Sequence, residues 1–110
     1  MEERRQHIRY CTDFSAKYFY IKRKTRCEGD TTVKDLSIKG MRLYLPPMIA
    51  KDDIFLVEMK SPALGTIAAI AKVIWTKDIQ AERESGARFD WVSNSNRLAK
   101  YIEDLKVKAA

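Results

Sequence analysis

The sequence has few of the residues from which metal sites and most catalytic sites are built. Its 110 residues include one histidine, His7, and two cysteines, Cys11 and Cys27, which do not form a C-x-x-C pair. This leaves too few soft ligands for a zinc site. A Ser-His-Asp hydrolase would have to use His7, and no nucleophile motif lies beside it. We therefore expect no metal, no cofactor and no catalytic residues.

Long apolar runs are also absent. The longest apolar stretch covers residues 67–74, is interrupted by Lys72, and falls well short of the ~20 residues that a membrane helix needs. No apolar core follows the charged residues 2–5, so the N-terminus lacks the pattern of a secretory signal. These features predict a cytoplasmic chain without a membrane span, in which Cys11 and Cys27 are reduced thiols.

The positive charge is concentrated near the N-terminus. The formal net charge is +6, and residues 1–26 carry eight lysines and arginines against three acidic residues. The remaining residues are close to neutral, with 13 basic residues against 12 acidic ones. A cationic segment of this kind favours an anionic partner such as a nucleotide, a nucleic acid or a membrane surface. A solubilising tail would have the same composition, so charge alone does not identify the partner.

Six short segments have the residue types and the alternation of β-strands, and turn signals separate them. The hydrophobic fraction of 45% and the length of 110 residues suit one globular domain. Strands at this spacing favour a closed or nearly closed antiparallel barrel. In the last segment the alternation points Phe89 and Trp91 into the core. Residues 22–26 are expected to form a cationic turn, and the predicted strands are residues 14–21, 31–36, 41–45, 54–59, 66–75 and 87–92.

The C-terminal segment changes to the period of a helix. Ser93 or Ser95 is expected to cap its start. The helix needs a surface to cover, either the barrel or a second subunit. The chain is thus expected to consist of an arm (residues 1–12), a barrel (residues 13–92) and a helix (residues 93–108) within a single domain. The apolar face of the helix recurs at i, i+3, i+4 and i+7 and consists of Leu98, Tyr101, Ile102 and Leu105.

Two motifs carry the candidate ligand-binding residues. In the first, Arg5 and Arg9 lie four residues apart and share one side of the chain whether it is extended or helical. Arginine binds phosphate oxygens, or the O6/N7 edge of guanine, through paired hydrogen bonds. This R-x-x-x-R pattern is common in basic proteins, so it is weak evidence when taken alone.

The second motif is D-x-S-x-x-G, formed by Asp35, Ser37 and Gly40. On a strand, Asp35 and Ser37 would share one face, while Leu36 and Ile38 would point into the core. A carboxylate can accept hydrogen bonds from N1 and the 2-amino group of guanine. Gly40 allows a left-handed backbone and the close approach of a ligand. A strand end whose polar side chains bond their own backbone would give the same pattern.

The two motifs in this order, followed by a β-rich remainder and a C-terminal helix, resemble the PilZ domain family of bacterial receptors for the second messenger cyclic di-GMP. The likeness extends over about residues 4–105 and includes all five motif positions. Residues 86–89 are also similar to a glycine-then-phenylalanine strand start found late in such domains. The resemblance implies a six-stranded antiparallel barrel with the ligand on its outer face, and a binding module rather than an enzyme.

The resemblance also implies a set of ligand-binding residues and a stoichiometry. Arg4 directly precedes the first motif, a feature that accompanies two stacked cyclic di-GMP molecules per chain. Trp75 is expected beside the ligand, although a tryptophan in a small barrel also fits the core. A signal would leave through an unidentified downstream protein, from a monomer or a weak homodimer. The implied cyclic di-GMP-binding residues are Arg4, Arg5, Arg9, Asp35, Ser37, Gly40 and Trp75.

Two other functions fit parts of the sequence. A small basic barrel that binds single-stranded nucleic acid would use exposed aromatic residues, for which Tyr18, Tyr20 and Tyr44 are candidates. Such a groove needs cations on several strands, whereas here they gather in residues 1–26, so we expect no DNA as a partner. A protein-interaction domain with an incidental arginine segment is the other alternative.

Overall fold

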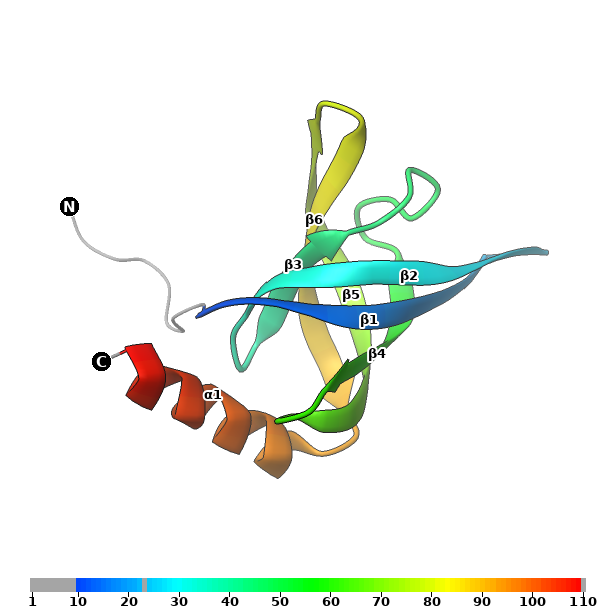
Figure 1. The fold of residues 1–110 in the computed structure, drawn as a ribbon. Helices are drawn as coiled ribbons and strands as arrows, with labels where there is room; N and C mark the ends of the chain where they lie inside the picture. The colour runs from blue at the N-terminus through cyan, green and yellow to red at the C-terminus, as the bar shows by residue number, and fades with distance from the viewer. Residues whose placement is uncertain (1–9, 23, 110) are drawn as a thin grey trace.

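The computed structural model describes residues 10–22 and 24–109 (Figure 1). These residues form six antiparallel strands and one helix, and the strands close into a barrel in the order β1-β2-β3-β6-β5-β4. The six-stranded antiparallel barrel and the C-terminal helix that the sequence predicts are therefore confirmed. The elements are β1 (Tyr10–Lys22), β2 (Thr25–Leu36), β3 (Gly40–Tyr44), β4 (Ile54–Ser61), β5 (Gly65–Ile79), β6 (Glu82–Val92) and α1 (Ser95–Ala109).

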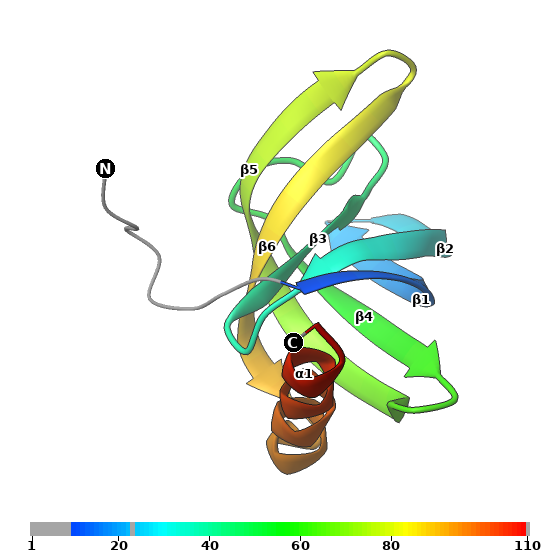
Figure 2. The same ribbon diagram turned by 60° about the vertical axis from the view of Figure 1, so that its left-hand side comes forward.

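Most strands are longer than their sequence patterns predict, because hairpin pairing continues past the apolar residues. Lys22 is paired with Thr25 at the end of the β1–β2 hairpin, so Lys22, Thr25 and Arg26 of the expected cationic turn are strand residues, while Lys24 is in a turn. Ile79 is paired with Glu82 in the β5–β6 hairpin, which projects beyond the barrel (Figures 1 and 2). These extensions are largely polar, so the alternation of apolar residues in the sequence does not reveal them.

The barrel encloses the hydrophobic core, and α1 closes one end of it. Figures 1 and 2 show α1 at the end where β6 finishes and β4 turns into β5. Leu98 and Ile102 are buried there in the same core as the strand residues. The helix therefore covers the barrel of its own chain, one of the two surfaces that its amphipathic pattern allowed. Within β5, the fully buried inward-facing residues are Ile67, Ala69, Ala71 and Val73.

The start of α1 is capped by Asn94. Its side-chain Oδ1 accepts a hydrogen bond from the backbone N–H of Arg97 at 2.9 Å. Ser93 instead joins the sheet: its backbone N–H donates to the carbonyl of Ala68 at 2.8 Å, and its Oγ accepts from the N–H of Ala68 at 3.0 Å. The prediction of Ser93 or Ser95 as the cap was wrong, because Asn94 stands between them and caps equally well.

Across residues 10–22 and 24–109, the one helix has 15 residues and is neither long nor apolar enough to cross a membrane.

Single-residue bulges interrupt the alternation in four strands, and the one in β1 lies between Cys11 and Phe14. An extra residue stands in β2 at Lys34, in β5 at Ile74 and in β6 at Asp90, each opposite an unbroken step of the partner strand. The bulge in β6 turns both Asp90 and Trp91 outward, so Trp91 is 51% exposed while Phe89 packs against the core. The prediction that Trp91 belongs to the core was therefore wrong.

Candidate functional site

Asp35 lies outside the core because of the bulge in β2. Val33 is fully buried, and strict alternation along the strand would also turn Asp35 inward. The extra residue Lys34 shifts the register, so that Asp35 is paired with Arg42 of β3 and Leu36 is fully buried. Leu36 points into the core as the sequence predicts, and Asp35 is left on the outer face.

Ser37 shapes the turn between β2 and β3. Its buried hydroxyl accepts hydrogen bonds from the backbone N–H groups of Lys39 and Gly40, both at 3.2 Å. Its backbone N–H donates to the carbonyl of Gly40 at 2.8 Å. The strand has already ended at Leu36, so Ser37 does not continue its face. Ile38 is 44% exposed, and its predicted place in the core was wrong because the turn breaks the alternation.

Gly40 allows β3 and β6 to approach each other closely. A Cβ atom at this position would lie 2.1 Å from the carbonyl oxygen of Ala87 and 3.2 Å from the Cα of Arg88. Its φ angle lies outside the left-handed region, in which Gly65 is found. The left-handed backbone that glycine allows is therefore not adopted at Gly40. Glycine serves here to let two backbones meet.

Trp75 lies outside the core because of the bulge in β5. Val73 is fully buried, and the extra residue Ile74 places both Ile74 and Trp75 on the outer side. The indole covers Gly86 of β6, where a Cβ atom would lie 2.1 Å from the indole Nε1. An aromatic ring over a cross-strand glycine is a recurrent way of filling the space that the glycine leaves. Of the two positions that the sequence allowed for Trp75, the structure excludes the core.

The β2–β3 turn and Trp75 line a small outer pocket of about 170 Å³. It brings together Ser37, Gly40 and Trp75, three of the residues that the sequence selects. Two exposed cations, Lys39 and Arg88, also line it. An aromatic face beside two cations suits a planar, negatively charged ligand. The lining is completed by Ile74, Gly86 and Ala87.

A row of paired residues connects Asp35 to this pocket across four strands. Asp35 of β2 is paired with Arg42 of β3. Arg42 is paired in turn with Gly86 of β6, which is also paired with Trp75 of β5. Asp35 does not itself line the pocket. Three strand spacings of about 4.8 Å separate it from Trp75, or about 14 Å in all.

Arg42 is held by carboxylates from the strands on both sides of it. Its Nε donates to Asp35 Oδ2 at 2.7 Å, and its Nη1 is ion-paired with Glu84 Oε2 of β6. The hydrogen bond to Asp35 raises the pKa of Arg42 above its usual value, although partial burial acts in the opposite direction. Sequence reasoning missed both Arg42 and Glu84. The alternation of β3 marks Arg42 as outward-facing, but no local signal links it to a residue 42 positions away.

Arg4, Arg5 and Arg9 lie outside the described residues. The description of the chain begins at Tyr10, within the segment expected to be an arm. Tyr10 is paired with Leu36, the last residue of β2. The chain therefore enters the barrel beside the D-x-S-x-x-G turn.

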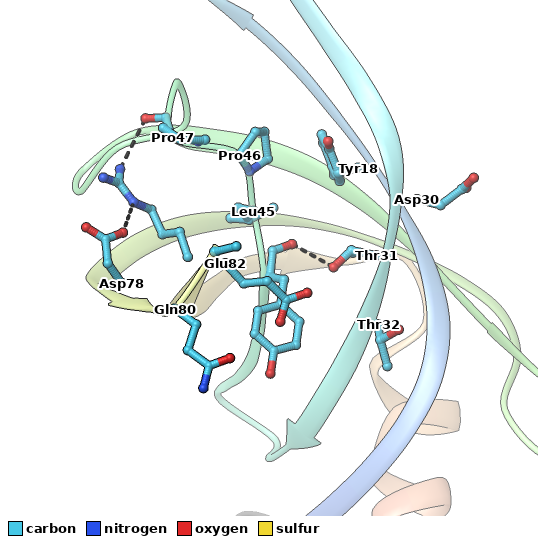
Figure 3. A pocket seen from close by; sticks show the side chains of 13 residues that line it. Tyr18, Asp30, Thr31, Thr32, Leu45, Pro46, Pro47, Asp78, Gln80 and Glu82 are labelled. Atoms are coloured by element: carbon cyan, nitrogen blue, oxygen red, sulfur yellow. Dashed lines mark hydrogen bonds and ion pairs between the residues drawn. The ribbon is translucent and has the colours of Figure 1, made fainter.

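A second, larger groove of about 440 Å³ lies at the other end of β3 (Figure 3). One cation, Arg83, lines it, and Arg83 Nε is bonded to Asp78 Oδ1 at 3.0 Å while Nη1 donates to the carbonyl of Pro47 at 3.2 Å. The other acidic residues of the lining are Asp30 and Glu82. The groove thus carries net negative charge and does not attract phosphate groups.

The three tyrosines considered for a nucleic-acid groove do not form a cationic platform. Tyr18 and Tyr44 line the acidic second groove. Tyr20 is buried, and its hydroxyl donates to Asp53 Oδ2 at 2.7 Å. Burial raises the pKa of Tyr20 to about 12. These positions weigh against stacking of a single-stranded nucleic acid on this surface.

Cys27 is a free, half-buried thiol. In the part of the chain that the structure describes, no three His, Cys, Asp or Glu side chains gather in a group that could hold a metal ion.

The family to which the chain belongs follows from its sequence as a whole. The sequence model of the PilZ domain matches residues 3–104, nearly the full length. The chain belongs to the PilZ domain family. No curated protein matches it.

Solved structures share the fold of this PilZ domain at low sequence identity. An inhibitor of motility from Bacillus subtilis (MotI/DgrA) is similar with a TM-score of 0.76 and 14% identity, covering 99% of this chain and 54% of that one. The MrkH–c-di-GMP complex of K. pneumonia has a TM-score of 0.75 and 18% identity, covering 98% and 55%. The PilZ domain of YcgR from Escherichia coli, solved with c-di-GMP, has a TM-score of 0.70 and 20% identity, covering 97% and 95%. The chain thus spans about half the length of the first two.

In this PilZ domain, Gly86→Ala is expected to push the Trp75 indole away from β6, because the new Cβ would lie 2.1 Å from Nε1. We expect the emission of Trp75 to shift to longer wavelength as the ring enters water. The spectrum is measured with Trp91→Phe as background, which leaves Trp75 as the one tryptophan. Gly29→Ala, whose Cβ would meet the Tyr18 hydroxyl at 2.7 Å, is the control and leaves the emission unchanged. Unchanged emission in Gly86→Ala would contradict the ring position.

Proposed function

We propose that this PilZ domain is a receptor for cyclic di-GMP, and that the ligand binds on the outer face of the barrel at the β2–β3 turn. The observation that carries the proposal is the pocket that joins Ser37, Gly40 and Trp75 where the chain enters β1. Membership of the PilZ family supports it, as do the similar folds of two proteins solved with c-di-GMP. Because those likenesses are of fold, the ligand assignment rests on the residues themselves.

The arginine motif is proposed to bind the phosphates and one guanine edge. Arg5 and Arg9 belong to the segment of residues 1–12 that we propose to be a ligand-binding arm. Tyr10 lies opposite Leu36, so the arm is attached next to the turn and within reach of the pocket. Guanidinium groups bind phosphate oxygens and the O6/N7 edge of guanine through paired hydrogen bonds, and thus match both parts of the ligand.

The barrel is proposed to supply the remaining contacts. The Asp35 carboxylate accepts from N1 and the 2-amino group of guanine, and the Trp75 ring offers a face for a base or an arginine. Four hydrogen bonds among Ser37, Lys39 and Gly40 hold the turn and fix the shape against which the ligand rests. Binding through fixed groups of this kind needs no catalytic step.

The chain is proposed to act as a binding module rather than an enzyme, in the cytoplasm, as a monomer or a weak homodimer. Ordering of an arm over the ligand would create a new surface, which is one way in which binding is converted to a signal. We propose that a downstream protein reads this surface. The acidic second groove and the buried Tyr20 give no support to nucleic acid as that partner.

Calorimetric titration at physiological salt tests the ligand. We expect a Kd of about 1 µM or lower for cyclic di-GMP and little binding of GTP or cyclic di-AMP. Adenine reverses the donor and acceptor at its 6-position, so groups arranged for guanine reject it.

Arg5→Ala and Arg9→Ala should each weaken binding about tenfold or more. Arg26→Ala, which removes a cation from the far end of the β1–β2 hairpin, is the matched control. Equal affinity for the guanine and adenine dinucleotides would contradict the proposal.

The same titration measures stoichiometry, for which we propose two cyclic di-GMP molecules per chain. Two stacked ligands bring four phosphate charges, and Arg4 beside Arg5 supplies a third guanidinium to neutralise one of them. Arg4→Leu is expected to lower the ratio from two to one, and added salt to weaken binding. A wild-type ratio of one that is unchanged in Arg4→Leu would show that Arg4 has no such role.

A further inference from the structure

Arg42 joins two carboxylates on the face where the ligand is proposed to bind. It stands on β3 between the buried residues Met41 and Leu43, and its side chain points outward. Its Nε donates to Asp35 on β2 at 2.7 Å, and its Nη1 is paired with Glu84 on β6. Three neighbouring strands thus contribute one charged group each, and none of the three residues is adjacent in sequence to another.

The three charged side chains are largely shielded from water. The exposed fractions of the side chains are 29% for Arg42, 14% for Asp35 and 10% for Glu84. Charge-assisted hydrogen bonds are short and directional, and shielding from water strengthens them. Arg42 therefore limits the rotation of the Asp35 carboxylate, and Glu84 limits the movement of Arg42 itself. A guanidinium held in this way is also kept from turning toward a ligand phosphate.

We propose that Arg42 is a positioning residue that orients the Asp35 carboxylate for recognition of the 2-amino edge of guanine. The inference rests on the proposed function and assigns a role to residues outside the two motifs. Asp35 Oδ1 is buried, so a ligand would be met by Oδ2. A carboxylate oxygen has two lone-pair sites, so Oδ2 can accept from a ligand as well as from Arg42. A carboxylate oxygen discriminates for the 2-amino group of guanine best when the plane of the carboxylate is fixed before the ligand binds. Arg42 supplies that fixed plane, and Glu84 secures Arg42.

The experiment compares cyclic di-GMP with its inosine counterpart, which lacks the 2-amino group, by calorimetric titration. The wild type is expected to prefer the guanine ligand by about tenfold or more. Arg42→Lys keeps the charge and loses the planar donor group. It should weaken binding of cyclic di-GMP and bring the ratio of the two affinities close to one. Glu84→Gln leaves Arg42 in place and should reduce the ratio by a smaller amount. Thermal unfolding is followed for each variant, and Glu84→Gln keeps the test valid if Arg42→Lys fails to fold.

Arg83→Lys is the matched control, because Arg83 is bonded to Asp78 at 3.0 Å in the second groove and lies away from the proposed site. It should leave both affinities unchanged. An equal loss of affinity for both ligands in Arg42→Lys would show a merely structural role and overturn the inference. Tighter binding in Arg42→Lys would show that Arg42 competes with the ligand for Asp35, and would also overturn it. If the wild-type protein bound neither dinucleotide, the proposed function itself would fail. If Asp35→Asn changed the affinities and Arg42→Lys did not, only the positioning role of Arg42 would be removed.

Discussion

A closed barrel forces each strand to turn alternate side chains inward and outward, and the arrangement of this protein's outer face depends on where that alternation is broken. With Lys34 as an extra residue in β2, Leu36 remains in the core and Asp35 lies outside it, where it bonds Arg42. With Ile74 as an extra residue in β5, Trp75 lies over β6 instead of inside the barrel. Without these two bulges, both side chains would point toward an apolar interior, where a carboxylate in particular is costly to bury.

Glycine and aromatic residues complete the same surface. Gly86 leaves room for the Trp75 indole, and Gly40 allows β3 to pass close to the carbonyl of Ala87. The row from Asp35 through Arg42 to Trp75 is therefore held by backbone pairing in four strands as well as by side chains. Groups positioned by a packed sheet bind a ligand at a lower entropic cost than groups on a loop.

The periodic parts of this fold can be predicted from the sequence, and its irregular parts cannot. Alternation indicates the six strands, and the stripe containing Leu98 and Ile102 indicates the helix. Both are repeating patterns of apolar residues that can be read directly from the sequence. A bulge adds one residue without changing residue type, so the outward position of Trp91 leaves no local signal. The partnership of Arg42 with Glu84 depends on the pairing of β3 with β6, which is set by barrel closure.

The candidate site, too, can be predicted from the sequence only in part. The D-x-S-x-x-G motif indicates the turn at which the pocket forms, because turn-forming residues such as serine and glycine can be recognised from the sequence. The hydrogen bonds of Ser37 to its own turn are local, and the motif allowed them as one of its two interpretations. The contact that makes Gly40 necessary instead involves the neighbouring strand β6 and follows only from the assembled barrel.

The β2–β3 turn and Trp75 together form the site at which we propose that cyclic di-GMP binds. Nuclear magnetic resonance of the isotopically labelled protein during titration with cyclic di-GMP tests it most directly. The largest shifts are expected at the backbone amides of Ser37, Lys39 and Gly40 and at the indole N–H of Trp75. Shifts confined to the second groove, at residues such as Tyr44 and Gln80, with none at the turn, would contradict it.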